Sequence, residues 1–168
     1  KAADPAALLN LSGRIVENMN RADRMIQALL DASRIGVGEK LALTLEPCNL
    51  TQLAATVLEE LSGIYGNRFR LEFAGDIEGL WDIHAVRRIL ENLVMNAVKY
   101  GAEDRAVEIF LRENPECVTM AIHNWGKAID EEEQKMLFQL HRRTKSAEKG
   151  GQRGWGIGLT IVKGLVEA

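Results

Sequence analysis

The sequence is short of cysteine and has no surplus of positive charge. Its 168 residues contain only two cysteines, Cys48 and Cys117, which form no C-x-x-C pair. Each is therefore expected to be a buried free thiol, which suits a reducing compartment. The 21 Lys and Arg residues face 24 Asp and Glu residues, leaving a formal net charge of -3. A general nucleic-acid binder needs a basic surplus, so no nucleic-acid partner is expected.

The sequence also lacks a long apolar run. No stretch approaches the roughly 18 residues that a membrane-spanning helix needs. The opening residues, KAADPAALLN, lack the basic segment and apolar block of a signal peptide. Hydrophobic residues make up 46% and charged residues 27% of the chain, which is ordinary for a globular protein. We therefore expect a folded, cytoplasmic chain without membrane contact.

The first 36 residues predict one long amphipathic helix. Asp4 and Pro5 are typical of a helix start, and Gly36 and Gly38 of its end. Its apolar residues recur at spacings of three and four, which suits a helical bundle. A single helix cannot bury such a stripe, so partners are expected, although the helix could instead pack on the following domain. The stripe consists of Leu8, Leu11, Ile15, Met19, Ala22, Met25 or Ile26, and Leu29.

Residues 41–168 predict a second, mixed domain. Alternating segments indicate strands, two of them joined as a hairpin. Asn49 or Thr51 can cap the first helix of this domain, and Asp82 can cap the second. Without regular strand–helix–strand units, the pattern favours an α+β, two-layer sandwich with helices on one face of the sheet. Strands are expected at 41–46, 68–73, 106–112 and 117–123, and helices at 52–61, 82–100, 130–140 and 156–167.

One stripe of the helix at 82–100 is polar. At about 100° per residue, Asn92, Asn96 and Lys99 lie within roughly 60° of one another. Amide oxygens suit Mg²⁺ and an ammonium suits phosphate, so the stripe could bind a metal–phosphate group. An ordinary solvated face remains the alternative.

Two neighbouring segments near the C-terminus suit phosphate binding. Gly154, Gly156 and Gly158 precede a helix, where backbone N–H groups can approach an anion. This is not the dinucleotide pattern, and a flexible hinge remains possible. The basic segment 142–154, which includes Arg143 and Lys145, suits a lid over a polyphosphate. A nucleic-acid patch is the rival interpretation, but the segment lacks interleaved aromatics.

The end of the strand at 117–123 is a fourth candidate. Asn124 carries both a donor and an acceptor, which suits an adenine edge, and Gly126 permits a tight turn. A plain β-turn is the alternative.

Together, these four segments resemble, in order and spacing, the ATP-binding domain of sensor histidine kinases, in the Bergerat-fold ATPase superfamily. Residues 92–100 resemble its N box, 124–129 its first glycine box and 154–159 its second. Leu137 and Phe138, with Arg143, resemble its F box. The helix at 1–36 resembles the second helix of the family's dimerisation and phosphoacceptor hairpin.

The resemblance implies a site for Mg-ATP. Asn96 would be the Mg²⁺ ligand, supported by Asn92 and Lys99, and Asn124 would face the adenine amino group. Arg143 would reach the terminal phosphate, and Asn92 and Arg143 would be the catalytic residues. The implied ATP-binding residues are Asn92, Asn96, Lys99, Tyr100, Asn124, Gly126, Ile129, Arg143, Lys145, Gly154, Gly156, Gly158, Leu159 and Thr160.

Several positions depart from the family pattern. Asn124 stands where an aspartate is common, and Ala128 where a second glycine is common. His141 replaces the second aromatic of the F box. Asn92 stands where gyrase-like ATPases place a glutamate base, and an amide cannot deprotonate water. This favours transfer to a protein side chain over hydrolysis.

The acceptor histidine is the remaining departure. His84, His123 and His141 all fall within the nucleotide domain, and none has an acceptor context. The chain is thus expected to begin after the acceptor helix and to stop before the family's last two strands. The implied protein is a histidine kinase that forms homodimers through its N-terminal helix, receives signals from an upstream sensor domain and serves a response-regulator receiver domain. The alternative is a dimerisation scaffold, with or without bound nucleotide, that has no kinase activity.

Overall fold

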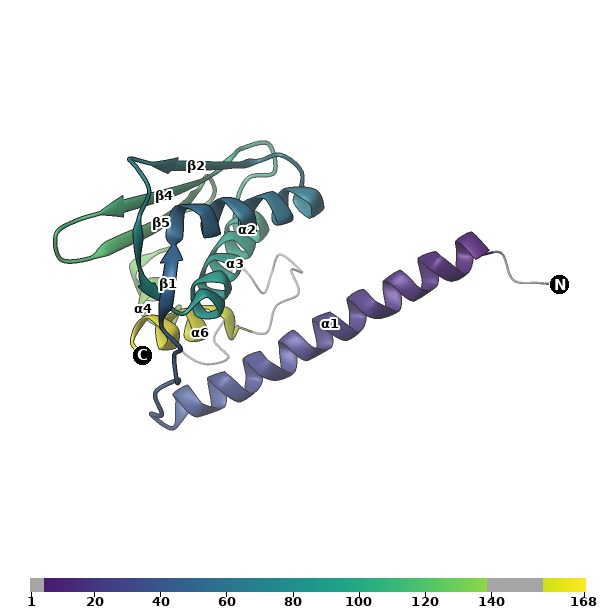
Figure 1. The fold of residues 1–168 in the computed structure, drawn as a ribbon, viewed down its shortest axis with the longest axis horizontal. Helices are drawn as coiled ribbons and strands as arrows, with labels where there is room; N and C mark the ends of the chain where they lie inside the picture. The colour runs from purple at the N-terminus through teal and green to yellow at the C-terminus, as the bar shows by residue number, and fades with distance from the viewer. Residues whose placement is uncertain (1–4, 139–155) are drawn as a thin grey trace.

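The computed structural model describes residues 5–138 and 156–168 (Figure 1). A long N-terminal helix precedes a mixed domain of strands and helices. The elements in chain order are α1 (Pro5–Gly36), β1 (Glu46–Asn49), α2 (Leu50–Tyr65), β2 (Phe69–Phe73), β3 (Glu78–Trp81), α3 (Ile83–Tyr100), β4 (Val107–Glu113), β5 (Val118–Asn124), α4 (Glu131–Met136) and α6 (Gly158–Val166).

The strands form a mixed three-stranded sheet and a separate pair, which with the helices confirms the predicted α+β class. In the three-stranded sheet, β4 pairs in parallel with β2 and antiparallel with β5. A separate antiparallel pair joins β1 to β3. Helices α2 and α3 lie together along one side of the three-stranded sheet (Figure 1). The fold is the two-layer sandwich expected from the sequence.

Helix α3 is the centre of the domain because it contributes to two cores. Leu90, Val94 and Ala97 are buried in the main core, with apolar residues of α2 and the sheet. Near its start, Ala85 is buried instead with Ile161 and Leu165 of α6. The polar stripe of α3 is consequently held on a helix that is fixed from two sides.

The predicted helix caps are present. Asn49 accepts a hydrogen bond from the Gln52 backbone N–H at 2.9 Å, so Asn49 rather than Thr51 caps α2. Asp82 accepts from the backbone N–H groups of Thr44 at 2.8 Å and Ala85 at 2.9 Å. These hydrogen bonds, that of Thr44 first, lower the pKa of the Asp82 carboxyl. The charged cap defines where α3 starts.

The strand predicted at 41–46 is wrong. Residues 41–45 form no strand, and β1 begins at Glu46 and includes Pro47. Leu41 and Leu43 are partly buried, but they pack against the core between α3 and α6 instead of pairing with another strand. Apolar alternation alone therefore did not indicate pairing. Pro47 is tolerated because, among the described residues, β1 pairs on one side only, with β3.

The structure differs from the sequence analysis in two other respects. The short strand β3, Glu78–Trp81, was not predicted, since four residues containing a glycine give little periodic signal. Cys48 is only half-buried and Cys117 is exposed, next to the turn between β4 and β5, so the expectation of two buried thiols is wrong. Burial and the charge of Glu46 raise the pKa of the Cys48 thiol.

Helix α1 is confirmed over its predicted length and has two different faces. Its C-terminal end lies near α6, while its N-terminal half extends away from the domain (Figure 1). Ala32 and Asp31 are buried near that end. Among the described residues, no helix has the length and apolarity to cross a bilayer. The exposed apolar face consists of Leu11, Ile15, Val16, Met19, Ile26, Leu29 and Leu30.

The predicted stripe is thereby refined at one position. Ile26 is 60% exposed, whereas Met25 is half-buried. At about 100° per residue, the exposed face and the face of Asp31 and Ala32 are roughly opposite. Ile26 belongs to the exposed apolar face of α1, and Met25 lies toward the side that faces the domain.

Candidate functional site

Asn92 lies where α3 meets the start of α6. Its side-chain Nδ2 donates to the Arg88 carbonyl oxygen one turn earlier, at 2.8 Å. That bond turns the amide oxygen toward Gly158, where a Cβ would lie 2.7 Å from Asn92 Oδ1. The absence of a side chain at Gly158 is therefore what lets the second glycine box approach the N box.

Asn96 follows one turn later on the same stripe. It is half-buried, and its amide makes no hydrogen bond with any side chain or backbone group within residues 5–138 and 156–168. A partly buried amide usually has a partner, so this group is available to a ligand. Its oxygen has the chemistry that Mg²⁺ prefers.

Lys99 and Tyr100 end the helix as a linked pair. The Lys99 ammonium donates to the Tyr100 hydroxyl at 2.9 Å and lies 4.7 Å from the centre of its ring. Tyr100 is 43% exposed. The half-buried Lys99 is thus held against Tyr100, on the same helical stripe as Asn92 and Asn96.

The start of α6 presents backbone N–H groups that no side chain of the described residues caps. Gly156 has a φ of +67°, a conformation that favours glycine. Within residues 5–138 and 156–168, no side chain caps the first N–H groups of α6. Gly158 opens the helix directly beside Asn92, and the half-buried Leu159 follows. The N–H groups at this helix start and the nearby amide oxygen together suit phosphate oxygens with a metal.

Thr160 faces the interior of the fold. It is 6% exposed, and its hydroxyl donates to the Phe138 carbonyl oxygen at 3.3 Å. The contact joins the F-box segment to the second glycine box. Its role as a direct ATP ligand stays a prediction.

The end of β5 meets the C-terminus of α3. Asn124 pairs with Val107 at the start of β4, which puts it next to the loop that follows α3. The Ala102 N–H donates to the Trp125 carbonyl oxygen at 2.6 Å. A Cβ on Gly126 would lie 2.9 Å from the Tyr100 carbonyl oxygen and 3.5 Å from Asn124 Nδ2. The first glycine box is therefore in close contact with the end of the N box.

The remaining predicted residues are at the edge or outside this region. Ile129 is 43% exposed, and its carbonyl oxygen accepts a hydrogen bond from the Gln134 side chain at 2.8 Å. Arg143, Lys145 and Gly154 lie outside the described residues, as does the basic segment predicted as a lid. The structure thus brings three of the four motif segments together around α3, with Phe138 from the fourth.

These residues fit a magnesium–nucleotide. Among the described residues, the Asn96 amide has no partner and no side chain caps the start of α6, against which the Asn92 oxygen lies. Gly126 and Gly158 occupy positions where a Cβ would meet a site residue. A polyphosphate with a hard cation matches amide oxygens and backbone N–H groups in this arrangement.

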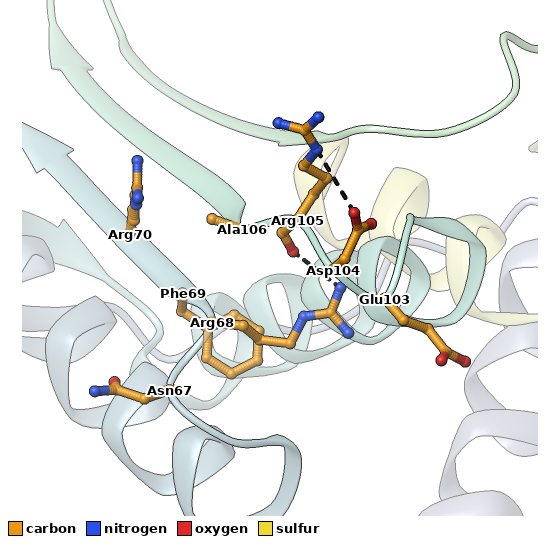
Figure 2. A pocket seen from close by; sticks show the side chains of 8 residues that line it. All are labelled: Asn67, Arg68, Phe69, Arg70, Glu103, Asp104, Arg105 and Ala106. Atoms are coloured by element: carbon orange, nitrogen blue, oxygen red, sulfur yellow. Dashed lines mark hydrogen bonds and ion pairs between the residues drawn. The ribbon is translucent and has the colours of Figure 1, made fainter.

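A separate hollow lies between the start of β2 and the α3–β4 loop (Figure 2). Its volume is about 370 Å³, and residues 67–70 and 103–106 line it. The Arg68 guanidinium crosses it and donates to the carbonyl oxygens of Ala102 at 2.6 Å and Arg105 at 3.1 Å. None of the predicted site residues lines this hollow, and Arg68 has a structural role there.

The sequence did not indicate one contact near the site. Asp31 of α1 forms an ion pair with Arg88 of α3, with 2.6 Å between Asp31 Oδ2 and Arg88 Nη1. The approach lies off the hydrogen-bond direction, so Oδ2 has charge pairing but no well-aligned donor. No local pattern links residues 57 positions apart, so only the folded structure could show this pair.

Comparison with known proteins connects these segments. The family described as histidine kinase-, DNA gyrase B-, and HSP90-like ATPase matches residues 81–168, a range that includes every predicted site residue. The chain is 29% identical over 160 residues to the probable sensor kinase SilS of Salmonella typhimurium, covering 91% of this chain and 32% of SilS. The chain therefore spans about a third of the length of that relative.

Solved structures agree with this match. The catalytic domain of histidine kinase ThkA superposes with a TM-score of 0.63 at 26% identity, covering 74% of this chain and 81% of that one. Full-length ShkA, solved in complex with AMPPNP, gives a TM-score of 0.72 at 21% identity over 99% of this chain and 35% of ShkA. At that identity, the likeness to ShkA concerns the fold alone, α1 included.

Proposed function

The chain belongs to the family of histidine kinase-, DNA gyrase B- and HSP90-like ATPases, and from that premise we propose that it binds Mg-ATP and presents the γ-phosphoryl group to a histidine side chain. The observation that carries this proposal is the meeting of the N box with both glycine boxes. Asn92 lies against Gly158 at one end of the stripe, and Tyr100 against Gly126 at the other. Such a span suits a nucleotide with its phosphates near α6 and its base near Asn124.

The metal end of the site would use amides. Asn96 would hold Mg²⁺, with Asn92 and Lys99 beside the phosphates. Bound Mg²⁺ would neutralise charge on the phosphate oxygens. The N–H groups at the start of α6 would orient those oxygens through Gly156 and Gly158. Among the described residues, the Asn96 amide has no hydrogen-bond partner and α6 has no side-chain cap, and both observations support these roles.

The adenine end would use Asn124. Its amide can hydrogen-bond the adenine amino group as an acceptor, although it lacks the charge of a carboxylate. Tyr100 and Ile129, each 43% exposed, would supply apolar surface around the base. Arg143 and Lys145 would approach the terminal phosphate, on the resemblance alone.

Transfer to a protein nucleophile is favoured over hydrolysis. Asn92 is tied to the Arg88 carbonyl oxygen through Nδ2 and has no proton-accepting group for water. The domain would act by positioning the phosphoryl group and stabilising its charge. A histidine supplied by another helix would be the acceptor, and an aspartate of a response-regulator receiver domain the next one.

Partners and location follow from the same proposal. The exposed stripe of α1 would pair with a second copy in a helical bundle, and an upstream sensor domain would control the kinase. The use of ATP would place the domain in the cytoplasm. The same stripe also favours a second candidate, a dimerisation scaffold without kinase activity, because it provides a dimer platform whether or not nucleotide binds.

Calorimetric titration tests the proposal. The chain is titrated with ATP in MgCl₂ and in EDTA, beside Asn96→Ala and, as a control, Asn67→Ala, an exposed amide outside the site. The chain and the control should bind ATP more tightly with Mg²⁺, and Asn96→Ala should lose that gain. Wild-type-like Mg-ATP binding by Asn96→Ala would contradict the metal assignment. Absence of nucleotide binding by the chain itself would favour the scaffold.

Radiolabelled ATP tests the transfer step. His84 and His123 are exposed, and neither stands in an acceptor context. The chain alone should acquire no acid-labile label, whereas a longer version with the upstream helix should. Label on the chain alone would show that one of its own histidines is an acceptor.

A further inference from the structure

Helix α1 holds both of the helices that meet at Asn92. On α3, Arg88 forms its ion pair with Asp31 of α1 and also accepts the Asn92 side-chain hydrogen bond through its carbonyl oxygen. On α6, the Ile35 side chain of α1 occupies the space that a Cβ on Gly164 would fill. The helix that begins at Gly158 is therefore fixed by α1 near its other end.

The contact has the features of a specific connection. Asp31 is 4% exposed, and its other oxygen, Oδ1, accepts from the Gln27 side chain at 3.2 Å. A buried carboxylate is strongly unfavourable without its partner, so the pair defines one relative placement of α1 and α3. Ala32, 1% exposed, packs in the same turn of α1.

We propose that Asp31, Arg88 and Ile35 are positioning residues for the nucleotide site: they hold α3 and α6 in the relative placement that keeps Asn92 against Gly158. The proposal rests on the function proposed above, since it concerns how tightly Mg-ATP binds. None of the three side chains needs to touch the nucleotide. The face that they use is roughly opposite the exposed stripe, so α1 can pair with another helix while it braces the site.

The effect should appear as nucleotide affinity. Packed networks of this kind change a distant affinity by about 0.5–2 kcal/mol, which corresponds to about 2- to 30-fold in Kd. Asp31→Asn removes the charge with little change in shape, and Arg88→Gln removes its partner. Each should weaken Mg-ATP binding within that range, and the double variant should be no worse than the poorer single variant.

The experiment compares these variants with Asp23→Asn, an exposed acid on the same helix. Titrations with ATP in MgCl₂ and in EDTA measure how much Mg²⁺ increases the affinity for ATP. This increase should be smaller in Asp31→Asn and unchanged in Asp23→Asn. Arg88→Lys, which keeps the charge, should retain more of this increase in affinity than Arg88→Gln. Ile35→Ala breaks the α1–α6 contact without leaving a charge unpaired, and it decides the matter if the charge variants do not fold.

A second readout needs no nucleotide. Hydrogen exchange of the unliganded chain should be faster in Asp31→Asn at the start of α6 and around residues 88–96, but unchanged in β4 and β5. The positioning role alone would be overturned if the wild-type chain binds Mg-ATP and both Asp31→Asn and Ile35→Ala match it in Mg-ATP affinity and in hydrogen exchange. A wild-type chain that binds no Mg-ATP would instead overturn the proposed function.

Discussion

A methyl group added at Gly158 tests the close approach between the two nucleotide motifs. A Cβ at this position would lie 2.7 Å from Asn92 Oδ1 and 3.6 Å from Asn92 Cγ. The first distance is too short for a carbon and an amide oxygen, so the Asn92 tip must move. Its movement would disturb the hydrogen bond from Nδ2 to the Arg88 carbonyl oxygen. Gly158→Ala should therefore strain the site without adding charge or polarity.

The expected loss of stability in Gly158→Ala is the balance of two opposing effects. Overpacking typically costs about 1–3 kcal/mol, and alanine in a helix regains about 0.5–1 kcal/mol over glycine. The backbone of α6 has little freedom to retreat, because Ile157 and Ile161 on either side are 7% and 2% exposed. A net loss of about 1 kcal/mol should lower the melting temperature by about 2–4 °C.

The matched control is Gly63→Ala. Gly63 lies within α2, and a Cβ there would meet nothing within 4 Å. The same substitution should therefore raise the free energy of unfolding by about 0.5–1 kcal/mol. Urea denaturation and thermal unfolding should thus show opposite signs for the two variants, and Mg-ATP affinity should fall only in Gly158→Ala.

A double variant identifies the clash itself. With Asn92→Ala, the oxygen that meets the new methyl group is gone, so adding Gly158→Ala should cost nothing further or stabilise the chain. A Gly158→Ala variant as stable as Gly63→Ala would refute the reasoning. So would a double variant that loses the sum of the two single effects.

Two further predictions concern the start of α3 and the free face of α1. Asp82→Ala should lower the free energy of unfolding by about 1 kcal/mol at pH 7, because an N-cap is lost. The folded pKa of Asp82 lies below its unfolded value, so its contribution to stability is complete well above about pH 4 and disappears as the pH falls through the folded pKa. Urea denaturation should therefore show a smaller difference in the free energy of unfolding between wild type and Asp82→Ala at pH 3 than at pH 7. An equal difference at both pH values would contradict the assignment. Ile15→Lys with Ile26→Lys should abolish self-association in sedimentation velocity, whereas two lysines at the exposed polar positions Gln52 and Thr56 of α2 should not. Equal dimerisation in both variants would exclude the stripe as the interface.

Features that depend on neighbours along the chain were predictable from the sequence. The helical periodicity of α1, α2 and α3 and the caps at Asn49 and Asp82 are local, because a helix bonds to itself within four residues. The β4–β5 hairpin is local for the same reason. The polar stripe of Asn92, Asn96 and Lys99 also needs only the pitch of a helix, so the motif could be found before the fold was known.

Contacts between segments distant in sequence required the tertiary structure. Leu41 and Leu43 alternate with other residues as in a strand, yet they pack against the core between α3 and α6. The Thr44 N–H donates to the Asp82 carboxylate and not to a neighbouring strand. Likewise, the periodicity of α1 left Met25 and Ile26 as alternatives, and only docking on the domain separated them. A periodic pattern tells which side chains share a face but not what covers that face.

The assembly of the site shows the same division. The sequence by itself predicted the segments that resemble the N box and the glycine boxes and the chemistry proposed for them, because each is a short pattern of residue types. The approach of Asn92 to Gly158, of Gly126 to the Tyr100 carbonyl oxygen and of Asp31 to Arg88 depended on the tertiary structure. These distances are set by how α1, α3, α6 and the sheet pack together, and packing depends on the shape of every surface in contact, which no local pattern contains.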